Sequence, residues 1–182
     1  QAEDGIRDCL LSRGLGDVYK RQDILILPQV ETPRGIATIE SWDCSNIEFS
    51  GIGFGSADYC ASTGGDMGKA SLAYGRGKII NAAALYNTLA LDGVWLDFRD
   101  PDGCREETLY VKTMGFKGRF AIHPDQIKPI HDAYRPTTEE LEWAKGVLEE
   151  AKTAGSGAFK YQGKMVDAPV LAVARLIISR ED

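Results

Sequence analysis

The chain has 182 residues, of which 43% are hydrophobic and 26% charged, values typical of a soluble globular protein rather than a disordered one. Its 27 acidic and 21 basic residues give a net charge of -6, and no basic run is interleaved with aromatic residues, so the composition gives no support for nucleic-acid binding. No apolar stretch reaches the roughly 20 residues needed to cross a bilayer. We therefore expect a soluble, cytoplasmic protein with neither a membrane nor a nucleic-acid partner.

The cysteines, Cys9, Cys44, Cys60 and Cys104, form no C-x-x-C pair and have no histidine at metal-ligand spacing. This pattern argues against a zinc site and against a disulfide framework. Free thiols in a reducing cytosol are the expected state.

Residues 1–22 lack an initiator Met and show neither helical nor strand periodicity. Part of this segment, SRGLGDVYKRQ, resembles translated adaptor sequence of the kind appended to metagenomic fragments. We therefore interpret residues 1–22 as a non-native, adaptor-like segment and leave it out of the fold prediction. A natural N-terminal helix is the alternative.

From residue 23 onward, strand-like and helix-like segments alternate. The patterns predict strands over 23–30, 47–55, 94–98 and 118–123, and helices over 33–42, about 72–91, 106–114 and from Pro124. Gly93 is placed as the C-cap of the second helix. Strands that alternate with helices at this spacing imply a parallel sheet with right-handed crossovers, either an open doubly wound sheet or a barrel.

The C-terminal part of the chain has a different pattern. Thr137 and Glu140 have the spacing of a capping box, which predicts the start of an amphipathic helix. A Gly/Ser-rich turn over 154–159 follows, and the last apolar helix is expected over about 169–178.

Two carboxylates follow the first two predicted strands. Glu31 comes directly after the first strand, and Asp58 comes shortly after the second. The C-terminal ends of parallel strands face the ligand in β/α folds, so the two acids come from neighbouring strands, could meet, and could then bind Mg²⁺. From spacing alone, capping of a following helix is an equally good interpretation. Gly55 and Ser56, just before Asp58, are candidates for contacting a ligand or for supporting the site.

Other residues near the predicted strand ends are weaker candidates. His123 either contacts a ligand or hydrogen-bonds the helix start at Pro124. Asp97 either orients the metal ligands or forms a turn with the residues that follow it. The STGGD segment, 62–66, either offers backbone amides to an anionic group or marks a turn. His131 is expected on the surface.

Several motifs together resemble a known family. PQVETPRGI, GFGSADY, LDFRDPDGCREETLYVKTMGFKGRFAIHPDQI and GAFKYQGKMVDAP resemble, in order and spacing, the citrate lyase beta-subunit-like branch of the HpcH/HpaI aldolase family. That branch includes malyl-CoA and citramalyl-CoA lyases. The resemblance covers roughly residues 23–180. It implies a TIM barrel, Mg²⁺ bound by Glu31 and Asp58, and a catalytic Asp167 donated to a neighbouring subunit of a homotrimer.

Asp167 also fits a simpler role. An aspartate followed by Ala-Pro and an apolar helix is a good helix N-cap, and the sequence by itself favours that role. The resemblance reverses the preference, and one residue can serve both purposes.

The resemblance further implies that residues 23–135 are the C-terminal half of a TIM (β/α)8 barrel, with 136–182 a helical extension that contributes to the neighbouring subunit. A complete barrel typically needs about 250 residues, and about four βα units are predicted here. The family's substrate-binding arginine, carried on an early strand, has no counterpart in 23–182. We expect half an enzyme, inactive alone, with unpaired strand edges and an apolar interior open to water.

For the complete enzyme, the resemblance implies Mg²⁺-dependent cleavage or formation of a carbon–carbon bond in a 3-hydroxyacyl-CoA such as malyl-, methylmalyl- or citramalyl-CoA. The products are an acyl-CoA and an α-oxo acid, with Asp167 as the candidate acid/base. Two alternatives stay open: a citrate lyase beta subunit acting on a carrier-protein thioester, and a thioesterase on the same scaffold.

Overall fold

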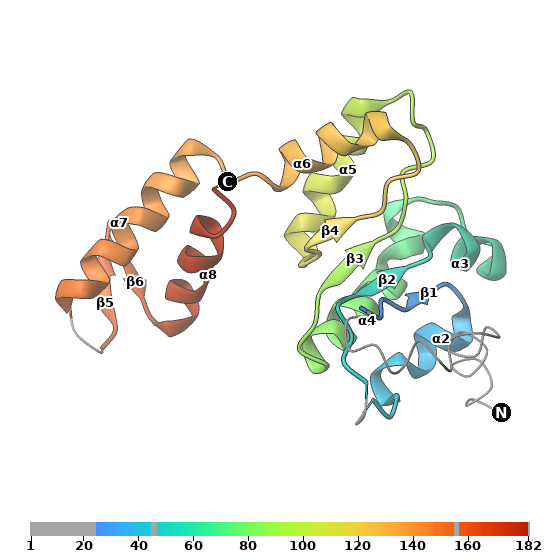
Figure 1. Ribbon diagram of the computed structural model, residues 1–182, viewed down its shortest axis with the longest axis horizontal. Coiled ribbons are helices and arrows are strands. Elements are labelled where there is room, and N and C mark those ends of the chain that lie inside the picture. Colours follow the sequence, from blue (N-terminus) through green and yellow to red (C-terminus); the bar gives the residue numbers. More distant parts are fainter. Residues whose placement is uncertain (1–24, 45–46, 155–156, 182) are drawn as a thin grey trace.

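The structure is a computed structural model that describes residues 25–44, 47–154 and 157–181. These residues form two units, each with its own hydrophobic core. Figure 1 shows a larger unit built around a sheet and a smaller helical unit, joined by the short segment between α6 and α7.

The larger unit contains a four-stranded parallel sheet. Its strands are β1 (Gln29–Val30), β2 (Ile52–Phe54), β3 (Ala90–Asp92) and β4 (Gly118–Arg119), and they pair in chain order. An isolated bridge between Ile26 and Phe49 extends the pairing of β1 with β2. Parallel neighbours need a crossover, and each of these strands is followed by at least one helix.

The helices of this unit fill those crossovers. They are α2 (Pro33–Thr38) with the 3-10 turn η2 (Ile39–Ser41), α3 (Ser56–Thr63), α4 (Lys69–Leu85), α5 (Pro101–Met114), and the 3-10 turn η3 (Pro124–Gln126) with α6 (Ile127–Tyr134). The order of elements confirms the predicted α/β fold of four βα units.

The position of the third strand was predicted wrongly. The strand is Ala90–Asp92, whereas the prediction gave these residues to the preceding helix and its cap and placed the strand at 94–98. The helix α4 ends at Leu85 because Asn87 has a positive φ of 51°, a conformation that terminates helices. The apolar run 94–98 lies in the segment between β3 and α5 instead.

Two further boundaries differ from the prediction. The strand expected over 118–123 is paired only at Gly118–Arg119. The helix expected over 106–114 begins earlier, at Pro101, because the Asp100 side chain accepts a hydrogen bond from the Gly103 N–H at 2.9 Å and caps it.

Helices cover one face of the sheet. The ring of Phe54, which is fully buried, packs directly against α4 at Gly75, where an added Cβ would lie 2.6 Å from the ring. Val30, Ile52 and Ala90 belong to the same core. Close approach of α4 to the sheet therefore depends on the missing side chain at Gly75.

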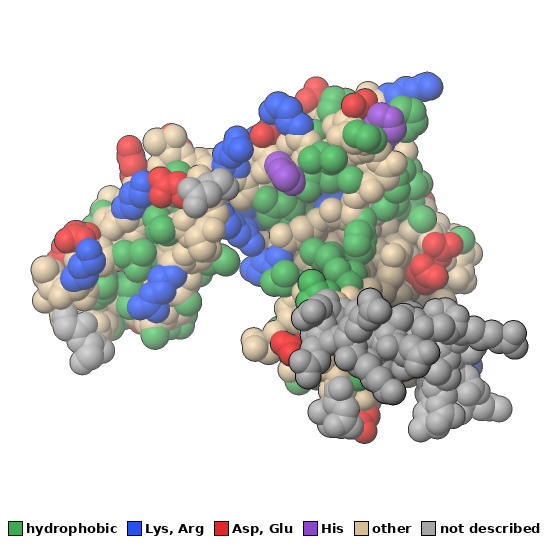
Figure 2. Space-filling view, viewed as in Figure 1, with side chains coloured by type: hydrophobic (Ala, Val, Ile, Leu, Met, Phe, Trp, Pro, Cys, Tyr) green, Lys and Arg blue, Asp and Glu red, His purple; other side chains and the backbone are tan. Residues whose placement is uncertain are grey.

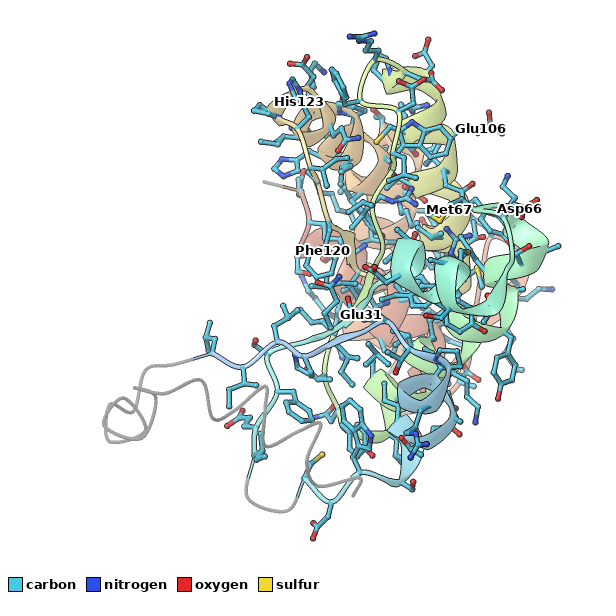
Figure 3. All side chains as sticks on the ribbon, turned by 90° about the vertical axis from the view of Figure 1, so that its right-hand side faces the viewer. Glu31, Asp66, Met67, Glu106, Phe120 and His123 are labelled. Atoms are coloured by element: carbon cyan, nitrogen blue, oxygen red, sulfur yellow. The ribbon has the colours of Figure 1, made fainter. Side chains whose placement is uncertain are left out.

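The opposite face of the sheet is apolar and largely open. Leu25, Leu27 and Leu89 are 81%, 39% and 50% exposed, and Phe120 packs across Gly53 on the same face as Leu27. Figure 3 shows Phe120 on the other side of the strands from Asp66, Met67 and Glu106. Figure 2 shows hydrophobic side chains gathered over the larger unit. An open apolar face of this kind is what the prediction of half a barrel implied.

The smaller unit consists of α7 (Thr138–Ala154), a hairpin of β5 (Phe159–Tyr161) and β6 (Lys164–Val166), and α8 (Ala168–Ile178). The predicted capping box is present, since the Glu140 N–H donates to Thr137 Oγ1 and the Thr137 N–H donates to Glu140 Oε2. The hairpin turns at Gln162 and Gly163, both with positive φ.

Among the described residues, none of the helices is long and apolar enough to cross a membrane. The Arg180 guanidinium lies 5.8 Å from the centre of the Tyr134 ring, so the residues just after α8 approach the end of α6.

The contact between α4 and the sheet can be tested with two glycines of the same helix. Gly75→Ala forces a Cβ into the Phe54 ring, at a cost of about 1–3 kcal/mol that exceeds the gain in helix propensity. Gly77→Ala meets no atom within 4 Å on the exposed side of α4 and should stabilise the chain by roughly 0.5–1 kcal/mol. Urea unfolding measures both free energies, and equal stabilisation by the two substitutions would contradict the packing described.

Candidate functional site

Glu31 and Asp58 lie at the same edge of the sheet, from neighbouring strands. Val30 pairs with Phe54, and the Gly55 N–H donates to the Val30 carbonyl at 2.9 Å, so Glu31 and Gly55 leave the sheet together. Figure 3 shows Glu31 where the chain leaves β1. Asp58 follows in the first turn of α3.

Gly55 makes room for Glu31. A Cβ added at Gly55 would lie 2.3 Å from the Glu31 Cβ and 2.9 Å from its Oε2. No side chain fits there without moving the Glu31 carboxylate. The glycine that begins α3 therefore sets where that carboxylate lies.

Neither acid caps a helix. The N-cap of α2 is Thr32, whose Oγ1 accepts from the Gly35 N–H at 3.1 Å, and the N-cap of α3 is Gly55. Glu31 and Asp58 are both exposed, and neither makes a hydrogen bond or ion pair with any residue that the structure describes. Helix capping by Glu31 or Asp58, the alternative that their spacing left open, is therefore not observed.

Two uncommitted carboxylates fit a Mg²⁺ site. Mg²⁺ is commonly held by one or two carboxylates while it keeps several waters or substrate oxygens. Within the described ranges no group of three or more His, Cys, Asp or Glu side chains comes together. The described part of the chain therefore offers two carboxylates at one edge of the sheet and no closed cage of the structural-zinc type.

Ser56 lies beneath this edge. Its side chain is 3% exposed, and a Cβ added at Gly93 would lie 2.0 Å from Ser56 Oγ. Ser56 therefore packs against the end of β3. Of the two roles considered for it, burial favours support of the site over contact with a ligand.

His123 and Asp97 are occupied locally. His123 Nδ1 accepts from the Asp125 N–H at 3.2 Å, as a cap for η3, and its ring stacks on Phe98 with centroids 4.6 Å apart. Asp97 Oδ1 accepts from the Arg99 N–H at 3.0 Å. Because β3 ends at Asp92, Asp97 does not follow a strand directly. His123 therefore hydrogen-bonds the helix start at Pro124, and Asp97 forms a turn with the residues that follow it.

The glycine-rich segment 62–66 is a turn. Gly64 ends α3 with a positive φ, and Asp66 Oδ1 accepts from the Gly68 N–H at 2.9 Å and from Ser71 Oγ at 2.7 Å. The Asp66 carboxylate therefore already accepts from the nearby N–H and O–H donors, which favours the turn interpretation over binding of an anionic group. His131 is exposed, as expected.

Asp167 is the N-cap of α8. Its Oδ1 accepts from the Val170 N–H at 3.3 Å. The residue belongs to the smaller unit, whereas Glu31 and Asp58 belong to the larger one, and Figure 1 shows the two units apart. The chain itself does not bring the three acids together.

Sequence reasoning missed a buried ion network at the end of β3. The Asp92 carboxylate, 0% exposed, accepts from Arg76 Nε and Nη2, each at 3.1 Å, and from Arg119 Nη2 at 2.8 Å. Arg76 Nη2 also lies 2.8 Å from Glu107 Oε1, and Lys69 lies 3.8 Å from the other oxygen of Glu107. The sequence contained one signal of this network, which is Arg76, a charged residue inside a predicted apolar helix.

The network keeps Arg76 charged. Burial works to lower the pKa of Arg76, but the carboxylates of Asp92 and Glu107 outweigh burial and raise it. Arg119 also donates from Nε to the Gly93 carbonyl at 2.9 Å. These bonds tie α4, α5, β3 and β4 together beside the proposed metal site.

The three cysteines that the structure describes are not poised as nucleophiles. Cys44, Cys60 and Cys104 are free thiols, as predicted, and burial raises the pKa of each. Cys9 lies outside the described residues.

Residues 1–124 match the family model of HpcH/HpaI aldolase/citrate lyase, and residues 77–181 match that of C–C bond lyase of the TIM-barrel fold. The chain belongs to the HpcH/HpaI aldolase/citrate lyase family. The first match includes residues 1–22, which we set aside as non-native. That interpretation concerns residues outside the described ranges and stays a prediction.

Curated relatives agree with this family. The chain is 32% identical over 171 residues to mitochondrial citramalyl-CoA lyase of Rattus norvegicus, covering 87% of this chain and 51% of the relative. It is 36% identical over 166 residues to a citrate lyase subunit beta-like protein of Mycobacterium tuberculosis, covering 87% and 59%. The chain thus spans about half the length of the curated relatives it matches.

A solved structure agrees as well. The crystal structure of protein CitE from M. tuberculosis in complex with magnesium, acetoacetate and coenzyme A superposes with a TM-score of 0.74 at 32% identity, over 91% of this chain and 64% of that one. The four βα units therefore correspond to part of a TIM barrel, as the motifs implied.

Removal of one charge tests the ion network. Asp92→Asn leaves two buried guanidinium groups without their main counter-charge, and should reduce the free energy of unfolding by about 3–5 kcal/mol. Asp132→Asn is the matched control, since Asp132 pairs with Lys128 on the surface of α6. Urea unfolding compares the two. A loss for Asp92→Asn no larger than that of the control would contradict the network's role.

Proposed function

We propose that the protein containing this chain is a Mg²⁺-dependent carbon–carbon lyase. It cleaves or forms a 3-hydroxyacyl-CoA thioester such as malyl-, methylmalyl- or citramalyl-CoA, with an acyl-CoA and an α-oxo acid as the other reactants. The observation that carries this proposal is the pair of uncommitted carboxylates, Glu31 and Asp58, at one edge of the sheet. The citramalyl-CoA lyase relative and the complex containing magnesium and coenzyme A support it.

Glu31 and Asp58 are the residues that would hold the metal. When bound, Mg²⁺ supplies a Lewis acid for the oxygen that becomes the new carbonyl. Gly55 keeps the Glu31 carboxylate at the end of β1, and Ser56 fixes the start of the helix that carries Asp58.

Asp167 is the proposed acid/base. In the cleavage direction Asp167 would accept the proton of the 3-hydroxyl, the carbon–carbon bond breaks with its electron pair moving to the α-carbon of the thioester, and Asp167 would return the proton to that carbon. The capping hydrogen bond of Asp167 uses Oδ1, so Oδ2 is the atom that would transfer the proton. The same aspartate can therefore start α8 and act in catalysis.

We propose that a second copy of the chain supplies this aspartate, in a homotrimer. Glu31 and Asp58 lie in one unit and Asp167 in the other. Exposed apolar side chains of the smaller unit support such docking, because Met165, Val173 and Leu176 are 72%, 51% and 40% exposed. These residues lie on the hairpin and helix that flank Asp167.

The second candidate is a citrate lyase beta subunit that acts on a citryl thioester of a carrier protein. It is favoured by the 33% identity over 162 residues with citrate lyase subunit beta of Escherichia coli. A thioesterase on the same scaffold is the third candidate.

We place the protein in the cytoplasm, and the unpaired state of the described cysteines supports a reducing compartment.

A product assay separates these functions. The protein containing this chain is incubated with a panel of 3-hydroxyacyl-CoA thioesters, and glyoxylate, pyruvate and free CoA are measured with Mg²⁺ and with EDTA. The lyase predicts oxo-acid release that needs Mg²⁺ and falls by about 100-fold or more in Asp58→Ala. Glu150→Ala, which removes an exposed acid of α7, should leave the rate unchanged.

Other outcomes would replace the proposal. Free CoA without an oxo acid would identify a thioesterase. Turnover of a carrier-protein thioester but of no CoA ester would identify a citrate lyase beta subunit.

A further inference from the structure

A cavity of about 220 Å³ lies between α4 and α5, beside the segment that follows β3. Its walls are largely apolar and include Met67, Leu72, Val94 and Leu96. Figure 3 shows Met67 near the start of α4, on the helix-covered side of the strands. Neither Glu31 nor Asp58 lines it, so the cavity is separate from the proposed metal pair.

Two buried donors in this wall lack acceptors. Among the described residues, Arg76 Nη1 and Trp95 Nε1 are buried without a hydrogen-bond partner, and both residues line the cavity. Arg76 is only 1% exposed. Buried polar groups are nearly always hydrogen-bonded, so two orphaned N–H groups in one cavity wall indicate an occupant with acceptor atoms.

The ion network holds Arg76 in this position. Its Nε and Nη2 are committed to Asp92, and Nη2 also contacts Glu107, which leaves Nη1 as the uncommitted nitrogen. Because one side of the guanidinium is already held by carboxylates, its remaining N–H groups can donate to a ligand without any further loss of side-chain freedom. Charge-assisted hydrogen bonds from such a group are stronger than neutral ones.

The nearby charges allow one added negative charge. Arg76, Arg119 and Lys69 are the cations of the network, and Asp92 and Glu107 are its buried anions; a third anion, Glu106, lies 4.0 Å from Lys69, but its side chain is 81% exposed and its charge is screened by water. Asp97 also lines the cavity, but it is exposed and opposes an anion only from the rim. A singly charged ligand therefore fits this site better than a doubly charged one.

We propose that the cavity binds a small monocarboxylate with a short apolar body. Its carboxylate oxygens accept from Arg76 Nη1 and Trp95 Nε1, and its apolar part contacts Leu72 and Leu96. Two donors match the two oxygens of a carboxylate, whereas phosphate needs more donors and carries more charge. This assignment does not rest on the proposed lyase activity.

Trp95 provides a direct probe. In ¹H–¹⁵N spectra of the 182-residue chain, each of the 3 tryptophans gives an indole N–H signal, and Trp95→Phe identifies that of Trp95. Titration with propionate should shift the Trp95 signal downfield with saturation. The signals of Trp42 and Trp143 should not move, which makes them internal controls.

Two substitutions should change the affinity for propionate in opposite directions. The affinity is measured from the shifts of the backbone amide signals of residues 94–96. Trp95→Phe removes one donor and should weaken binding by about tenfold. Asp97→Asn removes the opposing charge at the rim and should tighten binding by about two- to fivefold. Trp143→Phe, in the smaller unit, should leave the affinity unchanged.

Three results would overturn the assignment. The first is a Trp95 signal that does not shift or shifts without saturation, because water alone would then satisfy the donors. The second is an equal, saturable shift with inorganic phosphate. The third is an unchanged affinity in Trp95→Phe.

Discussion

The buried carboxylate of Asp92 is the group on which the rest of the larger unit depends. It ends β3 and accepts hydrogen bonds from Arg76 on α4 and from Arg119 on β4. Removing a buried charge from water costs several kcal/mol unless the charge is paired and hydrogen-bonded. A shift of either strand or of α4 would break that pairing, so the network fixes these elements relative to one another.

The same edge of the sheet carries the proposed chemistry. Glu31 follows β1 and Asp58 follows β2, and Gly93 connects the two regions because it packs against Ser56 directly after Asp92. Rigid support of this kind is what a metal site needs, since misplacement of a ligand by a fraction of an ångström weakens binding. Arg76 belongs to both features, because two of its nitrogens donate to Asp92, while its third nitrogen is buried without a partner and the residue lines the proposed carboxylate cavity.

Local patterns were sufficient to predict the order of the βα units, the capping box at Thr137 and the position of Glu31 and Asp58 at strand ends. They were not sufficient for the third strand, because the apolar helical pattern continues through Ala90–Asp92 and the helix ends only through the backbone conformation near Asn87. The ion network joins residues 16 and 27 positions apart, and periodicity contains no information on such pairs. Consequently, the sequence pattern predicted that Glu31 and Asp58, the proposed metal ligands, lie at one edge of the sheet, but it did not reveal the buried charges at the end of β3.

Binding of Mn²⁺ to the 182-residue chain, measured by electron paramagnetic resonance as a probe of the Mg²⁺ site, would test most directly whether Glu31 and Asp58 hold a metal. We expect a single saturable site that Mg²⁺ displaces, and an affinity lowered by about 10- to 100-fold in Glu31→Gln, in Asp58→Asn and in Gly55→Ala, which displaces Glu31 without removing its charge. Glu150→Gln should bind as the unmodified chain does. Unchanged Mn²⁺ affinity in the first three variants would contradict the metal site and the lyase mechanism built on it.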